Sequence, residues 1–216
     1  MNILLMGLPG AGKGTQSENI ERDYKIVHIA TGDIFRAAMK NETPLGLEAK
    51  SYIDAGNLVP DELTNNLVKE RLNQEDVKES GFMLDGYPRT IAQAEALDKN
   101  LSDLGSKIDA VIYIKVDPEV LKERLSGRIV CDNCGATYHK VYNPPTESGV
   151  CDVCSSTDFS QREDDKPEKV SHRINLQMES ISPILEFYKS KGMLKEVNGD
   201  QPIETVYREI RDLLGE

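Results

Sequence analysis

The sequence has 216 residues, 38% of them hydrophobic, and a formal net charge of −11 at pH 7. This length suits one main domain with small insertions, and the composition excludes disordered, collagen-like and coiled-coil proteins. The apolar run at residues 2–6 lacks a basic flank and is too short for a signal peptide or a membrane span. We therefore expect a cytoplasmic protein. Because acidic residues outnumber basic ones, we expect it to bind neither nucleic acid nor membrane.

Short apolar runs predict a parallel sheet. The apolar runs lie at residues 2–6, 25–29, 82–84, 110–116 and 194–197. Stretches of helical composition follow them, the first at residues 13–24. Strands that alternate with helices form parallel sheets covered on both faces. The sequence therefore predicts an α/β fold with a five-stranded parallel sheet flanked by helices.

Two stretches interrupt this alternation. Residues 31–73 carry only short helical patterns, which predicts a small helical insertion. Residues 128–165 contain all four cysteines and the pair Pro144–Pro145, which indicates a second insertion. The residues after it, 167–191, resemble one long helix with a kink at Pro183 and an end at Gly192.

A glycine-rich loop separates the first predicted strand from the first helix. Residues 7–15 read GLPGAGKGT and fit the pattern G-x-x-x-x-G-K. In this pattern backbone N–H groups curl around an anion, the helix N-terminus adds partial positive charge, and Lys13 reaches the outer phosphates. We expect a nucleoside triphosphate here; the alternative is a turn without a ligand. Because Gly14 follows Lys13, we expect no direct Mg²⁺ ligation by a hydroxyl at that position.

An aspartate ends a second predicted strand. Asp85 follows the run 82–84 and precedes a glycine turn and Arg89. Ligands of parallel sheets bind beyond the carboxyl ends of the strands. Asp85 is therefore a candidate to hold Mg²⁺, directly or through water; the alternative is that it caps a helix.

The cysteine spacing predicts a metal site. Cys131-x2-Cys134 and Cys151-x2-Cys154, 16 residues apart, match a tetrahedral four-cysteine Zn²⁺ site, which leaves no open position for catalysis. Two disulfides are disfavoured because nothing directs the chain out of a reducing compartment. A thioredoxin-like site is disfavoured because neither CxxC opens a helix after a strand. Nucleic-acid binding is disfavoured because residues 131–165 hold seven acidic and two basic residues.

Together these motifs resemble the adenylate kinase family of nucleoside monophosphate kinases. The motifs occur in family order: the loop 7–15, residues 31–36 (TGDIFR), residues 85–90 (DGYPRT) with Gln93, Gly127–Arg128, and residues 162–165 (REDD) with Arg173. The resemblance implies a P-loop core (1–29, 60–127 and 166–216), an AMP-binding domain (30–59) and a zinc-binding lid (128–165). It also implies a monomer whose substrates are ATP, AMP and ADP, with Mg²⁺ bound to ATP.

The resemblance also implies a role for individual residues. The ATP site would comprise Gly10, Ala11, Gly12, Lys13, Gly14, Thr15, Arg124, Arg128, Thr137, Tyr138 and Gln201. The AMP site would comprise Thr31, Arg36, Asn57, Leu58, Val59, Gly86, Tyr87, Pro88, Arg89, Gln93, Arg162 and Arg173, with Gln93 reading the adenine edge. Tyr87 stands where the family more often has phenylalanine.

The expected catalytic residues are Lys13, Arg36, Arg89, Arg128, Arg162 and Arg173, with Asp85. Two nucleotides that repel each other need fixed positive charge between them, and arginine forks bind phosphate oxygens while staying charged. The attacking AMP phosphate is already anionic, so no general base is needed, and we expect His28, His139 and His172 to be structural or solvent-facing. Asp164 and Asp165 either orient the lid arginines by salt bridges or form a solvated acidic run.

The expected reaction is reversible transfer of the γ-phosphoryl group of MgATP to AMP, giving two ADP, with the AMP-binding domain and lid closed over the substrates to exclude water. One alternative is a UMP/CMP-type kinase with another base in the acceptor site. The other is a non-catalytic nucleotide-binding switch. A GTP switch would show Ser or Thr directly after Lys13 and an Asn-Lys-x-Asp motif, and the sequence has neither.

Overall fold

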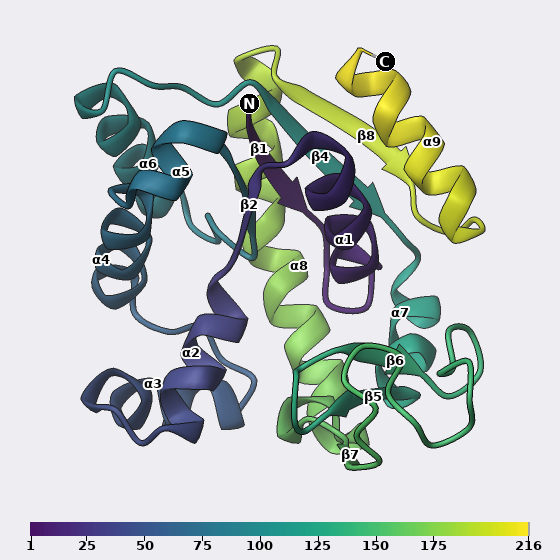
Figure 1. Cartoon of the computed structure of the whole chain (residues 1–216). Helices are drawn as coiled ribbons and strands as arrows, with labels where there is room; N and C mark the ends of the chain where they lie inside the picture. Colours follow the sequence, from purple (N-terminus) through teal and green to yellow (C-terminus); the bar gives the residue numbers. More distant parts are fainter. Residues whose placement is uncertain (216) are drawn as a thin grey trace.

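A five-stranded parallel sheet forms the centre of the computed structural model, which describes residues 1–215 (Figure 1). The strands are β1 (Asn2–Met6), β2 (Val27–Ala30), β3 (Phe82–Asp85), β4 (Ala110–Lys115) and β8 (Leu194–Asn198), in the order β2-β3-β1-β4-β8. This confirms the predicted fold class. The strand expected from residue 25 begins two residues later, because Lys25 has a φ of 53° and ends helix α1 (Lys13–Tyr24).

Helices cover both faces of the sheet. Successive residues of β1 point to opposite faces: Ile3 and Leu5 enter one buried cluster, and Leu4 and Met6 enter the other. The first cluster packs under α1, α7 (Pro118–Ser126) and α9 (Ile203–Leu214). The second packs under α4 (Asp61–Leu72), α5 (Glu75–Ser80) and α6 (Ile91–Asp103). Burial on both faces explains why the strands read as unbroken apolar runs.

The long helix α8 (Pro167–Ser190) contributes to both clusters, through Val170 and Ile174 near its start and Ile184 and Tyr188 near its end. Pro167 occupies its first turn, where a missing N–H costs nothing. Pro183 lies inside the helix, and the kink there stays a prediction.

The two insertions lie below the sheet in Figure 1. The first holds α2 (Thr31–Lys40) and α3 (Pro44–Asp54) and no strand, as expected. It is shorter than the predicted range of residues 31–73, because α4 packs on the central sheet through Val68 and Leu72. A Cβ on Gly46 would come within 2.2 Å of the Ala38 backbone, so a glycine lets the two helices pack closely. The second is a three-stranded antiparallel sheet of β5 (Arg128–Cys131), β6 (Thr137–His139) and β7 (Phe159–Ser160), followed by the 3₁₀ turn η1 (Glu163–Asp165).

No helix within residues 1–215 is long and apolar enough to cross a membrane.

Candidate active site

The glycine-rich loop joins β1 to α1 at the carboxyl edge of the sheet. Gly10 (φ 82°) and Gly12 (φ 91°) both lie in the left-handed region that favours glycine. A Cβ on Gly10 would meet the side chain of Leu125 at 3.1 Å, whereas one on Gly12 would meet nothing within 4 Å. The loop curls around Lys13, whose Nζ donates a hydrogen bond to the carbonyl of Gly7 at 3.1 Å. Glycine-rich loops of this kind present backbone N–H groups to an anion, and Lys13 lies against this one.

Asp85, the last residue of β3, faces this lysine. Its Oδ1 lies 3.7 Å from Lys13 Nζ, and its Oδ2 lies 3.8 Å from His28 Nε2. Burial alone would raise the pKa of Asp85, but Lys13 and then His28 outweigh it and hold the pKa below its usual value. Burial lowers the pKa of Lys13, and Asp85 offsets part of that effect. The helix-cap alternative for Asp85 is wrong, because the side chain of Thr90 caps α6.

The three histidines differ in their surroundings. Burial would lower the pKa of His28, but the Asp85 carboxylate 3.8 Å away raises it above the usual value. His139 Nδ1 accepts hydrogen bonds from the backbone N–H groups of Val141 and Tyr142, which is a structural role. His172 is exposed and lies 3.0 Å from Asn57 Oδ1.

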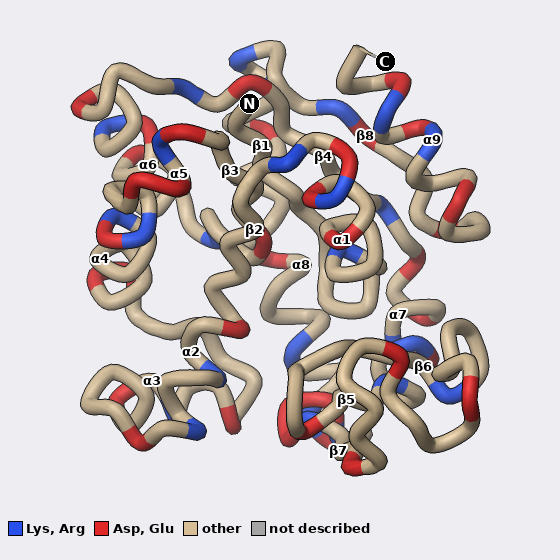
Figure 2. Tube along the Cα trace, in the orientation of Figure 1, with Lys and Arg blue, Asp and Glu red and all other residues tan. Residues whose placement is uncertain are grey.

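The six cations expected to be catalytic line one large cleft of about 810 Å³. They are Lys13, Arg36, Arg89, Arg128, Arg162 and Arg173, and they come from the core, from α2 and from the inserted sheet. Burial lowers the pKa of Arg162 to about 9 and that of Arg173 to about 10, so both guanidinium groups stay protonated at neutral pH. Seven Lys and Arg residues and four acidic residues line the cleft, so it is locally basic. The molecule as a whole is acidic, and Figure 2 shows acidic segments along outer helices such as α5.

Buried carboxylates hold several of these arginines. Asp165, fully buried, accepts two hydrogen bonds of 2.6 Å from Arg128 and one of 2.7 Å from Arg173. Asp164 lies 3.0 Å from Arg173. Burial would raise the pKa of Asp164, but Arg173 and its neighbours lower it below the usual value. Asp165 thus pairs with Arg128 of the predicted lid, as expected, whereas Asp164 pairs with Arg173 of α8, outside that lid. The alternative of a solvated acidic run is wrong for both aspartates, which are buried. Arg162 instead lies 3.4 Å from Asp33 on α2.

A smaller cavity of about 50 Å³ adjoins the cleft beside α2 and α8. Nine of the residues predicted for AMP line it: Thr31, Arg36, Asn57, Leu58, Val59, Gly86, Arg89, Gln93 and Arg173. Five residues line both spaces: Gly32, Arg36, Gly86, Arg89 and Arg173. The two spaces therefore meet at three arginines.

Two predicted AMP residues line neither space. The Tyr87 side chain is 2% exposed, and its hydroxyl lies 2.7 Å from Asn65 Oδ1, because the turn at Gly86 (φ 78°) directs the ring into the core. Pro88 is buried beside it. Arg162 lines only the large cleft.

The adenylate kinase family model matches residues 5–193 of the chain. The chain belongs to the adenylate kinase family. It is 58% identical to the adenylate kinase of Limosilactobacillus reuteri over 99% of this chain and 98% of that protein. It is 58% identical to the adenylate kinase of Lactococcus lactis over the full length of both, and 57% identical to that of Geobacillus sp. WCH70 over 100% of this chain and 99% of the relative. Like other adenylate kinases, it is a phosphotransferase.

In this member of the adenylate kinase family, all residues predicted for ATP line the large cleft: Gly10, Ala11, Gly12, Lys13, Gly14, Thr15, Arg124, Arg128, Thr137, Tyr138 and Gln201. Arg124 donates a hydrogen bond to the carbonyl of Gly199 at 3.1 Å, which joins α7 to the segment after β8. The sequence reasoning missed the apolar part of this wall, Pro202, Ile203 and Val206, and it missed Tyr142 and Asn143 of the insertion. These residues belong to no motif. The one sequence feature that could have indicated them is that they follow the end of a strand, β6 or β8.

On the acceptor side the sequence reasoning missed Phe35, Ile53, Gly56, Thr64 and Gln177. Gln177 follows Arg173 by four residues on α8 and so shares its helix face. Phe35 follows Thr31 by four residues on α2 in the same way. Helical spacing from a motif residue is the signal that could have found Gln177, and Phe35 already lies inside the motif at residues 31–36.

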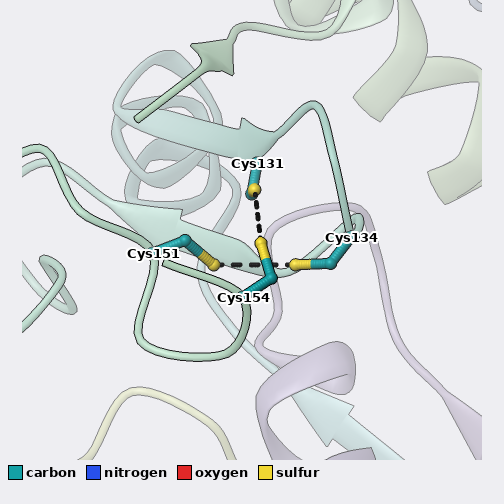
Figure 3. Close-up of side chains that lie close together, drawn as sticks. All are labelled: Cys131, Cys134, Cys151 and Cys154. Carbon is teal, nitrogen blue, oxygen red and sulfur yellow. Dashed lines mark hydrogen bonds between the residues drawn. The ribbon is translucent and has the colours of Figure 1, made fainter. Parts of the chain in front are cut away.

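The four cysteines of this adenylate kinase form a compact cluster (Figure 3). Their sulfur atoms all lie within 4.8 Å of one another, with Cys131 and Cys154 3.6 Å apart and Cys134 and Cys151 3.6 Å apart. A disulfide requires about 2.05 Å, and all four cysteines are free. A tetrahedron with metal–sulfur bonds of about 2.3 Å has sulfur–sulfur edges of about 3.8 Å. The cluster therefore fits a metal ion held by four thiolates.

Proposed function

We propose that the large cleft binds MgATP, that the smaller cavity binds AMP, and that the γ-phosphoryl group passes directly from one to the other to give two ADP. The single observation that carries this assignment is the overlap of the two spaces at Arg36, Arg89 and Arg173. Cations that face both spaces lie where the phosphates of a donor and an acceptor would meet.

The residues around this overlap supply charge and position, and no proton acceptor is needed. The N–H groups of the loop, residues 10–15, would hold the ATP phosphates, and Lys13 would move from the Gly7 carbonyl to the outer phosphates. Arg36 and Arg89 would hold the AMP phosphate, which is anionic near neutral pH. Arg128, Arg162 and Arg173 would offset the charge that spreads over the transferred group. Gln93 would read the adenine edge.

We further propose that three parts move relative to one another: a core (1–29, 60–127 and 166–216), an AMP-binding domain (30–59) and a lid (128–165). The lid has its own three-stranded sheet and its own buried cluster, which supports this division. Two contacts join the lid to α2. Lys40 Nζ donates a hydrogen bond to the carbonyl of Asp132 at 2.8 Å, and Arg162 lies 3.4 Å from Asp33. Closure along these contacts would exclude water, which otherwise competes with AMP for the phosphoryl group.

Two metal ions belong to this proposal. Mg²⁺ would accompany ATP and neutralise phosphate charge, with Asp85 as the protein carboxylate beside it. Zn²⁺ would be held by Cys131, Cys134, Cys151 and Cys154 in a structural role. The buried core of the lid consists of Cys131, Tyr138 and Cys151, which is too small to hold a fold without a cross-link.

An acceptor-panel assay tests the proposed function. ATP is supplied with AMP, CMP, UMP or GMP, and ADP formation is followed. We expect AMP to give the highest kcat/KM. A faster reaction with CMP or UMP would establish the pyrimidine kinase alternative. Hydrolysis of ATP alone, with no ADP gained on addition of AMP, would establish the switch alternative.

A further inference from the structure

Asp61, at the start of α4, lines neither cavity but contacts a residue that does. Its Oδ1 accepts a hydrogen bond of 2.8 Å from Gln93 Nε2, and its Oδ2 accepts one of 2.8 Å from the Thr90 hydroxyl. On its other side, Gln93 Oε1 accepts a hydrogen bond of 2.7 Å from the backbone N–H of Arg89. The side-chain amide of Gln93, in a residue only 2% exposed, is therefore held at both ends.

These two partners fix which way the amide faces. A glutamine amide can rotate by half a turn and exchange its oxygen and nitrogen. The N–H of Arg89 can only donate, and an ionised Asp61 carboxylate can only accept. One orientation satisfies both partners, and the reverse orientation loses both hydrogen bonds. The fixed amide keeps one N–H and one oxygen lone pair for a ligand in the cavity.

Neighbouring bonds fix the backbone from which this side chain projects. The N–H of Gln93 donates to the Thr90 hydroxyl at 3.1 Å, which caps α6, and the Tyr87 hydroxyl lies 3.0 Å from the Gln93 carbonyl. These contacts hold the main chain whichever way the amide faces. Of the two partners of the amide, Arg89 contributes its backbone N–H, which a substitution does not remove, whereas Asp61 contributes its side chain. A substitution at Asp61 therefore tests the fixed orientation of the amide.

We propose that Asp61 is a positioning residue that makes the acceptor site selective for 6-aminopurine over 6-oxopurine nucleotides. Adenine presents an amino donor beside the acceptor N1, whereas a 6-oxopurine presents an oxygen acceptor beside a donor N–H. An amide of fixed orientation matches one of these patterns and leaves polar groups unpaired against the other. The inference rests on the proposed binding of the AMP base at Gln93.

The test compares AMP with inosine monophosphate as acceptors, at a saturating concentration of MgATP. Inosine monophosphate reverses the donor and acceptor and adds no other group. Asp61→Ala removes the carboxylate that holds Gln93. Glu62→Ala is the matched control, because it removes an exposed carboxylate from the same first turn of α4. Asp61→Asn keeps an oxygen that can accept from Gln93 and tests for rescue.

We expect Asp61→Ala to lower the ratio of kcat/KM for AMP to that for inosine monophosphate by about 10-fold, chiefly through a higher KM for AMP. The KM for ATP should not change. Glu62→Ala should keep the wild-type ratio, and Asp61→Asn should stay within about 3-fold of it. If Asp61→Ala proves unstable, Asp61→Ser replaces it, since a serine hydroxyl suits a helix start but is too short to reach Gln93.

An unchanged ratio in Asp61→Ala, or an equal loss with both acceptors, would overturn the inference and leave Asp61 as a structural residue. Failure of the proposed function is distinguishable, because it would appear in the wild-type enzyme as a lack of preference for AMP.

Discussion

At the scale of single residues, carboxylates, Asp165 buried and Asp33 exposed, determine where the arginines of the cleft point. Asp165 bridges Arg128 of the lid and Arg173 of α8, and Asp33 lies between Arg36 and Arg162. Removing guanidinium groups from water is costly unless a negative partner accompanies them. These pairs keep the cations in place before any nucleotide binds, so little reorganisation is needed when phosphates arrive.

Replacing Lys13 or Arg89 by alanine should lower kcat by about 100-fold or more, because each change removes positive charge that stabilises the transferred group. Steady-state kinetics with MgATP and AMP measure the effect, and melting curves establish that the variants are folded. Lys99→Ala, at an exposed position on α6, serves as the control. Wild-type turnover in either site variant would show that the site is misassigned.

Asp164→Asn should lower the free energy of unfolding at pH 7 by about 1–3 kcal/mol, because Arg173 loses one of its two buried partners. The pKa of Asp164 in the folded state lies below its unfolded value of about 3.9, so the stabilisation is complete above that pH. It is lost as the pH falls through the folded pKa.

Urea unfolding of the wild type and the variant between pH 7 and pH 3 measures this difference. The difference in free energy of unfolding between the two proteins should be constant down to about pH 5 and should become smaller below about pH 4. Asp158→Asn, which changes an exposed lid carboxylate, should stay within about 0.5 kcal/mol of the wild type. A difference in free energy of unfolding that grows as the pH falls would contradict a stabilising ion pair between Asp164 and Arg173.

Local motifs explain which residues the sequence could predict. The loop residues 10–15 and the cysteine pairs lie a few positions apart, so their spacing alone predicted phosphate binding and a metal cluster. Asp61 and Gln93 are 32 positions apart and belong to different helices, so only the folded chain shows their contact. The inward turn of Tyr87 likewise depends on core packing around Asn65, which no local pattern carries.

At the scale of elements, the alternation of apolar runs with helical stretches predicted all five strands of the central sheet. Their spatial order, β2-β3-β1-β4-β8, depends on which helices pack on which face and did not follow from the runs. The lid differs, because its strands β6 and β7 are too short to show an alternation of apolar and polar residues. The cysteine spacing was the only strong sequence signal for this insertion.

The metal should stabilise the lid as an element. Removing it with a chelator should lower the melting temperature by about 5 °C or more, because the lid loses the cross-link that replaces a core. Metal analysis by mass spectrometry establishes that the sample is metal-free and identifies the ion in the untreated protein. Adding Zn²⁺ back should restore the original melting curve. Unchanged melting of verified metal-free protein would refute a structural role.

At the scale of the whole molecule, an acidic protein brings two polyanions together. The net charge of −11 repels phosphate at long range, while seven cations line the cleft. The cations come from the core, from α2 and from the lid, so the full set assembles only when these parts lie close together. Charge assembly and exclusion of water would therefore result from the same closing movement.

The most direct test of this account follows the γ-phosphoryl group itself, with ATP labelled at that position and AMP as the second substrate. The account predicts that the label passes to the β-position of the ADP formed from AMP, that two ADP appear for each AMP consumed, and that little label enters inorganic phosphate. Label that enters inorganic phosphate at a rate independent of AMP would contradict it.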